Sequence, residues 1–222
     1  MSSLGSLAVN VVSLCTSTWG LWRASNIILP ECLASAGHKQ FLTNISVGVT
    51  ILNNLVNVLG ALGLRKARYV SRQVTLPIAL VMETVVAIVY WPLRLFAVGL
   101  IMHGVKDGSR MPISKEIDCC IHLLPVLYLL IDYFAFEPAP FKMGKGRAWL
   151  VVTVLGLGYN RYLTKLIDPS RGQAYPYPFL DVAEPLKSVI FMGVTTLAWL
   201  FYCMYKKVHK AEPAAMEHGK KD

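Results

Sequence analysis

Six long apolar runs, separated by short basic or polar segments, constrain the fold of this chain more than any single motif. A run of about 20 predominantly apolar residues is long enough to cross a bilayer as a helix. Hydrophobic residues make up 55% of the 222 residues and charged residues 16%, whereas soluble domains carry about a quarter charged residues. The sequence therefore predicts an all-α, polytopic membrane helical bundle with about six transmembrane helices.

These runs are expected to form a single integral-membrane domain over residues 1–210, followed by a flexible cytosolic tail over residues 211–222. The predicted spans are Leu4 to Trp22, Phe41 to Leu64, Val74 to Met102, Ile117 to Phe136, Ala148 to Ile167 and Pro185 to Tyr205. The third span is the longest and contains Pro77 and Pro92, which predict a tilt or a kink.

Basic residues give the chain a formal net charge of +9 and gather in the segments after spans two, four and six. In these segments they are Arg65, Lys66, Arg68 and Arg72; Lys142, Lys145 and Arg147; and Lys206, Lys207, Lys210, Lys220 and Lys221. Loops rich in Lys and Arg stay on the cytosolic side, so both termini are predicted to be cytosolic. Membrane lipids with anionic head groups are the expected partners; nucleic acid is not, because no nucleic-acid-binding signature is present.

His122 lies inside the apolar run Ile117 to Phe136, where an imidazole loses water and marks a functional site by default. Thr43 opens another run. In the predicted topology, spans two and four run in the same direction, with Thr43 two residues and His122 five residues into their spans. At ~1.5 Å per residue, their depths differ by about one helical turn. The two side chains therefore share a leaflet, and adjacent helices would bring them into contact.

Asp118 precedes His122 by one helical turn, on the same face of the helix. A carboxylate beside an imidazole fixes its tautomer and raises its basicity, as a general base requires. The alternative is that Asp118 caps the helix and His122 only satisfies a neighbouring group. We favour the functional interpretation because of the depth of His122.

A polar stripe follows span two at helical spacing, so it must face other helices rather than lipid. It consists of Thr43, Ser46, Thr50, Asn53, Asn54 and Asn57. For the asparagines, including Asn53, we favour interhelical hydrogen bonds over the wall of a polar cavity. Thr43 lies at the end of the stripe nearest the aqueous phase. For this residue, both an interhelical hydrogen bond and a place in the wall of a polar cavity stay open.

Span three contains Glu83 and Arg94, which lie too far apart to pair with each other. Each is expected to pair with another helix, and the alternative for Arg94 is binding of a ligand carboxylate. The loop before span six, Q-A-Y-P-Y-P-F-L, includes Tyr177 and lies on the side of Thr43 and His122, where it could cover a pocket. Neither the histidines nor the five cysteines show ligand spacing, so no metal site and no cofactor are expected.

Three motifs resemble the androgen-induced gene 1 family, which includes the androgen-dependent TFPI-regulating protein. They are G-H-K-Q-F-L-T-N at residues 37–44, D-C-C-I-H-L-L-P at residues 118–125 and Y-P-F-L at residues 177–180. Order, spacing and six-span layout agree along most of the chain. Members are atypical threonine hydrolases of the membrane that cleave fatty acid esters of hydroxy fatty acids. The resemblance implies Thr43 as nucleophile and His122 as base.

The expected site adds Asp118, which spacing alone suggests as the group that orients His122. Asn44, Asn53, Arg94 and Tyr177 are the predicted substrate-binding residues, with Asn44 and backbone amides as possible oxyanion donors. The competing class is a non-enzymatic membrane carrier or scaffold, although no internal repeat of the carrier type is evident. The absence of G-x-S-x-G excludes an ordinary α/β-hydrolase. The endoplasmic reticulum is the default location for a multi-pass lipid enzyme, and the sequence carries no signal for oligomeric state.

Overall fold

The computed structural model describes residues 4–105 and 112–209, and within these ranges the chain is helical with no strand. Five described segments are long and apolar enough to cross a membrane. They are α1 (Leu4–Ser25), α3 (Leu42–Ala61), the continuous segment Arg65–Phe96, the segment Lys115–Phe136 and α9 (Leu186–Val208). The predicted all-α membrane bundle is therefore confirmed. The predicted tail over residues 211–222 lies outside the described residues.

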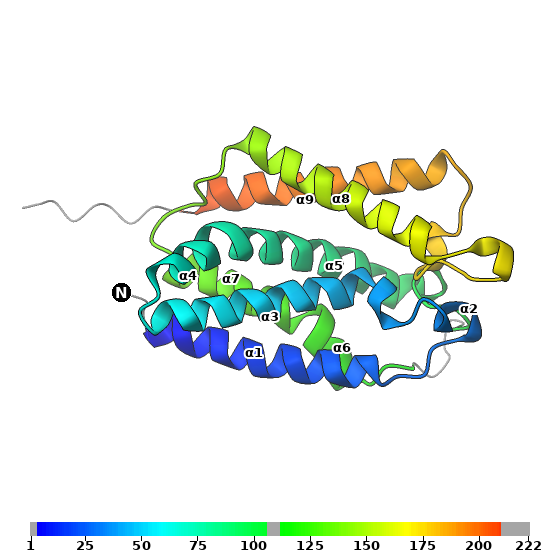
Figure 1. Ribbon diagram of the computed structural model, residues 1–222, viewed down its shortest axis with the longest axis horizontal. Helices are drawn as coiled ribbons and strands as arrows, with labels where there is room; N and C mark the ends of the chain where they lie inside the picture. Colours follow the sequence, from blue (N-terminus) through cyan, green and yellow to red (C-terminus); the bar gives the residue numbers. More distant parts are fainter. Residues whose placement is uncertain (1–3, 106–111, 210–222) are drawn as a thin grey trace, which may run out of the picture.

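The remaining predicted span coincides with α8 (Lys145–Leu166), which has 22 residues, as many as α1. It is less apolar than the other five segments, because basic residues lie at both of its ends. In Figure 1, α8 lies beside α9 and runs along the bundle with the other long helices. Its length and direction therefore match those of a sixth span, although its composition is more polar.

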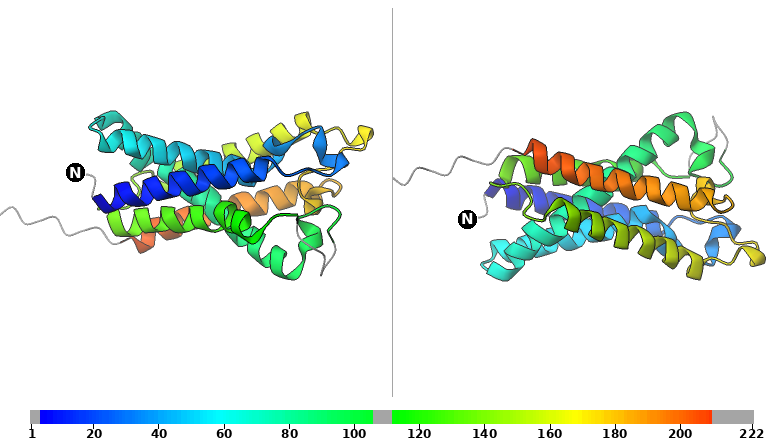
Figure 2. Two further views of the ribbon diagram at one scale, coloured as in Figure 1. Left: turned by 90° about the horizontal axis from the view of Figure 1, so that it is seen from below. Right: turned by 90° about the horizontal axis from the view of Figure 1, so that it is seen from above.

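Successive long helices run back and forth, so the described chain begins and ends at the same end of the bundle, here called the terminal end (Figure 1). The opposite end, here called the loop end, contains α2 (Glu31–Ala34), η1 (His38–Gln40), η3 (Val98–Leu100), η4 (Pro169–Arg171) and η5 (Pro178–Leu180). Figure 2 shows α1 beside α7 (Leu124–Phe136), while the α8–α9 pair lies on the other side of the bundle.

The third span differs from its prediction at both ends. It consists of α4 (Arg65–Val70), the π-helical segment η2 (Ser71–Thr75) and α5 (Leu76–Phe96). The expectation that Arg65 to Arg72 form a loop was wrong, and so was the expectation that the helix continues to Met102. The π-helical turn ends two residues before Pro77, whose ring and missing N–H disturb regular helical hydrogen bonding.

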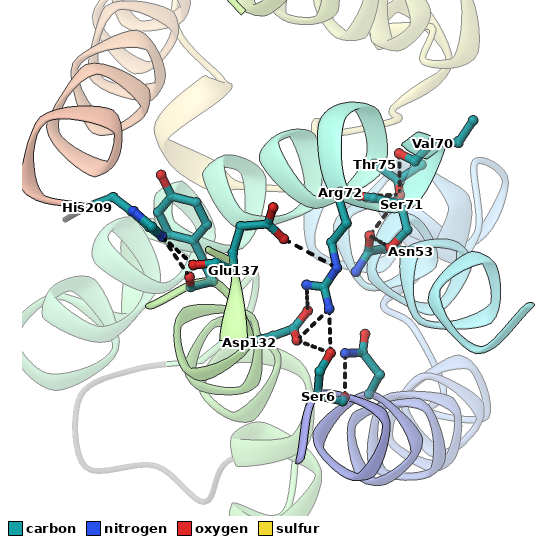
Figure 3. A network of polar contacts seen from close by, with 11 residues as sticks. Ser6, Asn53, Val70, Ser71, Arg72, Thr75, Asp132, Glu137 and His209 are labelled. Carbon is teal, nitrogen blue, oxygen red and sulfur yellow. Dashed lines mark hydrogen bonds and ion pairs between the residues drawn. The ribbon is translucent and has the colours of Figure 1, made fainter. Parts of the chain in front are cut away.

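Arg72 stays in this helix because it has buried acidic partners at the terminal end (Figure 3). Its guanidinium lies 2.7 Å from the Asp132 carboxylate and 3.4 Å from that of Glu137. It also hydrogen-bonds to the hydroxyl of Ser6, which in turn donates to Asp132 at 2.7 Å. This network connects α1, the π-helical segment and the end of the fourth span.

The fourth span is not one straight helix. It is divided into α6 (Lys115–His122) and α7 (Leu124–Phe136) at Leu123, whose φ of −128° and ψ of −57° depart from helical values. Pro125 follows this break and cannot donate a backbone hydrogen bond to the preceding turn. His122 is consequently the last residue of α6, and its carbonyl accepts a hydrogen bond from Trp91 Nε1 at 3.1 Å.

The polar stripe of α3 faces the interior, as predicted, and all six of its members are buried. It contacts α1, α5 and η2 through hydrogen bonds from Thr50 to Glu83 at 2.9 Å, from Asn54 to Ser13 at 2.9 Å and from Thr75 to Asn53 at 2.7 Å. Large apolar side chains instead cover much of the outer surface. This distribution suits a bundle surrounded by lipid, in which polar groups must pair internally.

Candidate active site

Thr43 and His122 meet at the loop end of the bundle. Thr43 is in the first turn of α3, and His122 is the last residue of α6. Thr43 Oγ1 lies 3.3 Å from His122 Nε2, and the two residues are only 6% and 5% exposed. The contact predicted from span direction and depth is therefore confirmed.

Asp118 continues this chain of polar contacts on the other side of the imidazole. Its Oδ1 lies 2.9 Å from His122 Nδ1, as the four-residue spacing predicted. Because Nδ1–H donates to the carboxylate, Nε2 keeps a lone pair directed at the Thr43 hydroxyl. Thr43, His122 and Asp118 thus have the nucleophile, base and orienting-group arrangement that recurs in covalent hydrolases.

Two further residues hold the Asp118 carboxylate in place, both from the last turns of α5. The Tyr90 hydroxyl donates to Oδ1 at 2.5 Å, and Arg94 Nε lies 3.3 Å from Oδ2. Asp118 forms no capping contact at the start of α6, whose N-cap residue is Ser114. The carboxylate is therefore organised toward His122 rather than toward the helix terminus.

The face of the imidazole is covered by Tyr90, whose ring is stacked on that of His122 with centroids 3.4 Å apart and planes 5° from parallel. Together with the hydrogen bond from Trp91 to the His122 carbonyl, this contact fixes both ring and backbone. Sequence reasoning missed Tyr90 and Trp91. The available signal was that Tyr90 precedes Arg94 by one turn, so both occupy one face of the helix.

Tyr177 reaches the same site from the loop before α9. Burial raises the pKa of its phenol, and hydrogen bonding to the side chain of Thr43 and to the backbone of Thr43 and Leu42 lowers it in part. Its ring packs edge-on against Phe41 and is stacked on Phe179. The prediction that this loop lies on the side of Thr43 and His122 is confirmed.

A cavity of about 440 Å³ opens onto this group of residues. Its polar lining comes from Thr43, Asn44, Tyr90, Tyr177, His38, His103 and His122. The rest of the wall comes mainly from apolar residues at the loop end. A concave site with a few converging polar groups is the usual form of a small-molecule pocket.

A family model described as FAR-17a/AIG1-like protein matches residues 5–210. The chain belongs to the FAR-17a/AIG1-like family. It is 50% identical over 212 residues to UPF0641 membrane protein YHR140W of Saccharomyces cerevisiae, covering 90% of this chain and 89% of the relative. UPF0641 membrane protein PJ4664.05 of Schizosaccharomyces pombe is 28% identical over 224 residues, covering 98% and 95%. No solved structure matches significantly.

In this FAR-17a/AIG1-like protein, the other predicted site residues lie at different distances from Thr43. Asn44 lines the cavity and donates from Nδ2 to the His38 carbonyl at 2.9 Å. Arg94 pairs with Asp118, so the interhelical pairing favoured for it is found. Asn53 lies ten residues further along α3, about three turns from Thr43, and accepts hydrogen bonds from Thr75 and Ser71 (Figure 3). A substrate-binding role for Asn53 stays a prediction without a contact at the site.

Proposed function

We propose that this protein is a membrane lipid-ester hydrolase that cleaves fatty acid esters of hydroxy fatty acids, with Thr43 as nucleophile and His122 as general base. The observation that carries the proposal is the buried hydrogen-bonded series Thr43–His122–Asp118 beside a cavity. Membership of the FAR-17a/AIG1-like family is consistent with it. A carrier or scaffold would not need this series of side chains next to a pocket.

In the proposed first step, His122 Nε2 takes the proton of the Thr43 hydroxyl, and Thr43 Oγ1 attacks the carbonyl carbon of the ester. The resulting imidazolium is stabilised by Asp118. When the tetrahedral intermediate collapses, the bond between the carbonyl carbon and the alcohol oxygen breaks. That oxygen takes the proton from His122, the hydroxy fatty acid leaves, and an acyl-threonine remains.

In the second step, His122 removes a proton from water, and the hydroxide attacks the acyl-threonine. Collapse of this second intermediate breaks the bond to Thr43 Oγ1, which recovers its proton from His122, and the fatty acid is released. Thr43 lies in the first turn of α3, where backbone N–H groups lack helical acceptors and the helix dipole is positive. The positive end of this dipole favours the oxyanion that forms in both steps.

The test is hydrolysis of such esters by the purified protein in detergent micelles, together with labelling by a fluorophosphonate probe. We expect Thr43→Ala to abolish both, and His122→Ala to lower hydrolysis by about 10²–10⁴-fold, the contribution typical of a general base. Thr43→Ser should retain activity, because it keeps the hydroxyl.

Thr84→Ala is a matched control, because Thr84 is also a buried threonine whose hydroxyl is hydrogen-bonded, in this case to Tyr205. It lies outside both the site and its cavity, so this variant should retain hydrolysis and labelling. If Thr43→Ala and His122→Ala both keep wild-type hydrolysis, the proposed function is wrong. The endoplasmic reticulum and a cytosolic position of both termini are part of the proposal, and reporter tags and organelle markers test them.

A further inference from the structure

A second, larger cavity of about 820 Å³ lies between the α8–α9 pair and the helices α3 and α5. Its walls are mainly aliphatic. They include Ile78 and Val85 from α5, Val151 and Leu155 from α8, and Val194 and Ala198 from α9. The mechanism described above makes no use of this space. In a membrane, an aliphatic groove of this size suits a hydrocarbon chain.

The groove adjoins the smaller cavity beside Thr43 and His122. His38, Asn44 and Tyr177 line both of them. Asn44 follows Thr43 in sequence, and Tyr177 lines the smaller cavity together with Thr43. Thr43 and its neighbours therefore stand at the junction of two cavities, where a bond between two halves of one molecule would be placed.

The groove is long enough for one lipid chain. On α8 its lining extends from Ala148 to Tyr162, which at ~1.5 Å per residue corresponds to about 21 Å. The hydrocarbon core of a bilayer is about 30 Å thick, so the chains of one leaflet extend about 15 Å. A fatty acyl chain of ordinary membrane length therefore fits along α8 from the junction toward the terminal end.

The two cavities differ in polarity. Besides the shared His38, the smaller one has His103 and His122 on its wall, and it lies among the loops at the loop end. The larger one extends away from this polar end between apolar helix faces. An ester of a hydroxy fatty acid is divided in the same way, because its acyl part is wholly apolar while its other part carries a free carboxylate.

We propose that the groove between α5 and the α8–α9 pair binds the acyl chain that is transferred to Thr43, and that the smaller cavity holds the hydroxy fatty acid part. This assignment rests on the proposed hydrolase function. It makes residues halfway along the groove determinants of acyl-chain length. Leu155 is at such a position, and Val151 lies one turn further from the junction.

The first experiment measures kcat/KM for 4-nitrophenyl acetate, octanoate and palmitate with the full chain in detergent micelles. We expect Leu155→Trp to lower the ratio of palmitate to acetate hydrolysis by about tenfold or more, because an indole would block the groove. Val151→Trp should lower it less, since it leaves about one more helical turn, ~6 Å, of groove open.

Leu157→Trp is the matched control, because Leu157 is on the same helix, is 61% exposed and lies outside both cavities. Its chain-length profile should equal that of the wild type. The inference is overturned if Leu155→Trp has the wild-type profile, or if Leu157→Trp changes the profile as much as Leu155→Trp does.

A second experiment separates this inference from the proposed function. A photoreactive palmitic acid analogue is cross-linked to Thr43→Ala protein in micelles, and the modified peptides are mapped. We expect cross-links in α8 and α9 on the groove side, and their loss in the double variant Thr43→Ala with Leu155→Trp. This readout needs no hydrolysis, so it decides the inference even if Thr43 is not a nucleophile. Cross-links confined to the outer surface would overturn it.

Discussion

At the scale of single residues, the site depends on how Asp118 is held rather than on Thr43 and His122 alone. Tyr90 and Arg94 contact the Asp118 carboxylate from α5, and the Tyr90 ring also covers the imidazole of His122. A carboxylate with three fixed partners cannot rotate away from the base. The orientation of His122 thus depends on α5 as well as on Asp118 of its own helix.

Asp118→Asn should therefore act as a positioning variant. The amide keeps the shape of the carboxylate but removes its charge and can present an N–H to His122 Nδ1, which favours the wrong tautomer. We expect kcat for ester hydrolysis to fall by roughly 10²–10⁴-fold with little change in KM. Asp118→Glu should recover part of the loss.

The measurement is a full kinetic profile at several pH values, with the melting temperature as a check on folding. A merely structural role would lower the melting temperature and leave kcat per folded molecule unchanged. An Asp118→Asn protein with wild-type kcat at every pH would contradict the assigned role.

The contact between Thr43 and His122 was predictable because helix rise and span direction alone determine depth in a membrane. Tyr90 and Trp91 were not predicted as part of the site, and Arg94 was predicted as a substrate-binding residue rather than as the partner of Asp118. Their participation depends on how α5 is rotated about its own axis relative to α6. That rotation results from packing over the whole interface, and hydropathy along one helix carries no information about it.

At the scale of helices, irregular turns place the functional groups. The break at Leu123 ends α6 at His122, and the π-helical turn Ser71–Thr75 turns Arg72 toward Asp132. The prolines Pro77 and Pro125 that accompany these turns could be read from the sequence. The continuation of the helix back to Arg65 could not, because basic residues before a span normally indicate a cytosolic loop. Here the buried partners of Arg72 outweigh that tendency.

Asp132→Asn should destabilise the bundle, because it leaves the guanidinium of Arg72, only 12% exposed, with Glu137 as its remaining acidic partner. Removing one partner of a buried ion pair typically costs about 3 kcal/mol. We expect a lower melting temperature in detergent, measured by tryptophan fluorescence. The double variant Arg72→Met with Asp132→Leu should recover much of the loss, since it removes both charges. A double variant as unstable as Asp132→Asn would contradict this account.

At the scale of the whole molecule, the number of crossings decides where the two ends lie. Both ends of the described chain are at the terminal end of the bundle (Figure 1), which requires an even number of crossings. Five segments qualify by length and composition, so we propose that α8 supplies the sixth despite its basic ends. Its side against α9 is covered, and Lys and Arg at helix ends can extend toward the head groups.

Reporter tags at the N- and C-terminus should therefore be on the same side of the membrane, and the charge bias predicts the cytosolic side. Protease protection or glycosylation tags on sealed microsomes measure this directly. A tag inserted between residues 137 and 144 should also be cytosolic, and one inserted between residues 168 and 174 should be protected. Termini on opposite sides would show that α8 does not cross.

The place of Thr43 at the start of its helix has a kinetic meaning under the proposed mechanism. The ester arrives by lateral diffusion within the lipid, whereas the water that frees the acyl-threonine arrives from the aqueous phase, and the two meet only at this boundary. Turnover would then follow the mole fraction of ester in the bilayer rather than its amount per volume of solution. Diluting the ester with inert phospholipid should slow the reaction even when the total ester in the tube is unchanged.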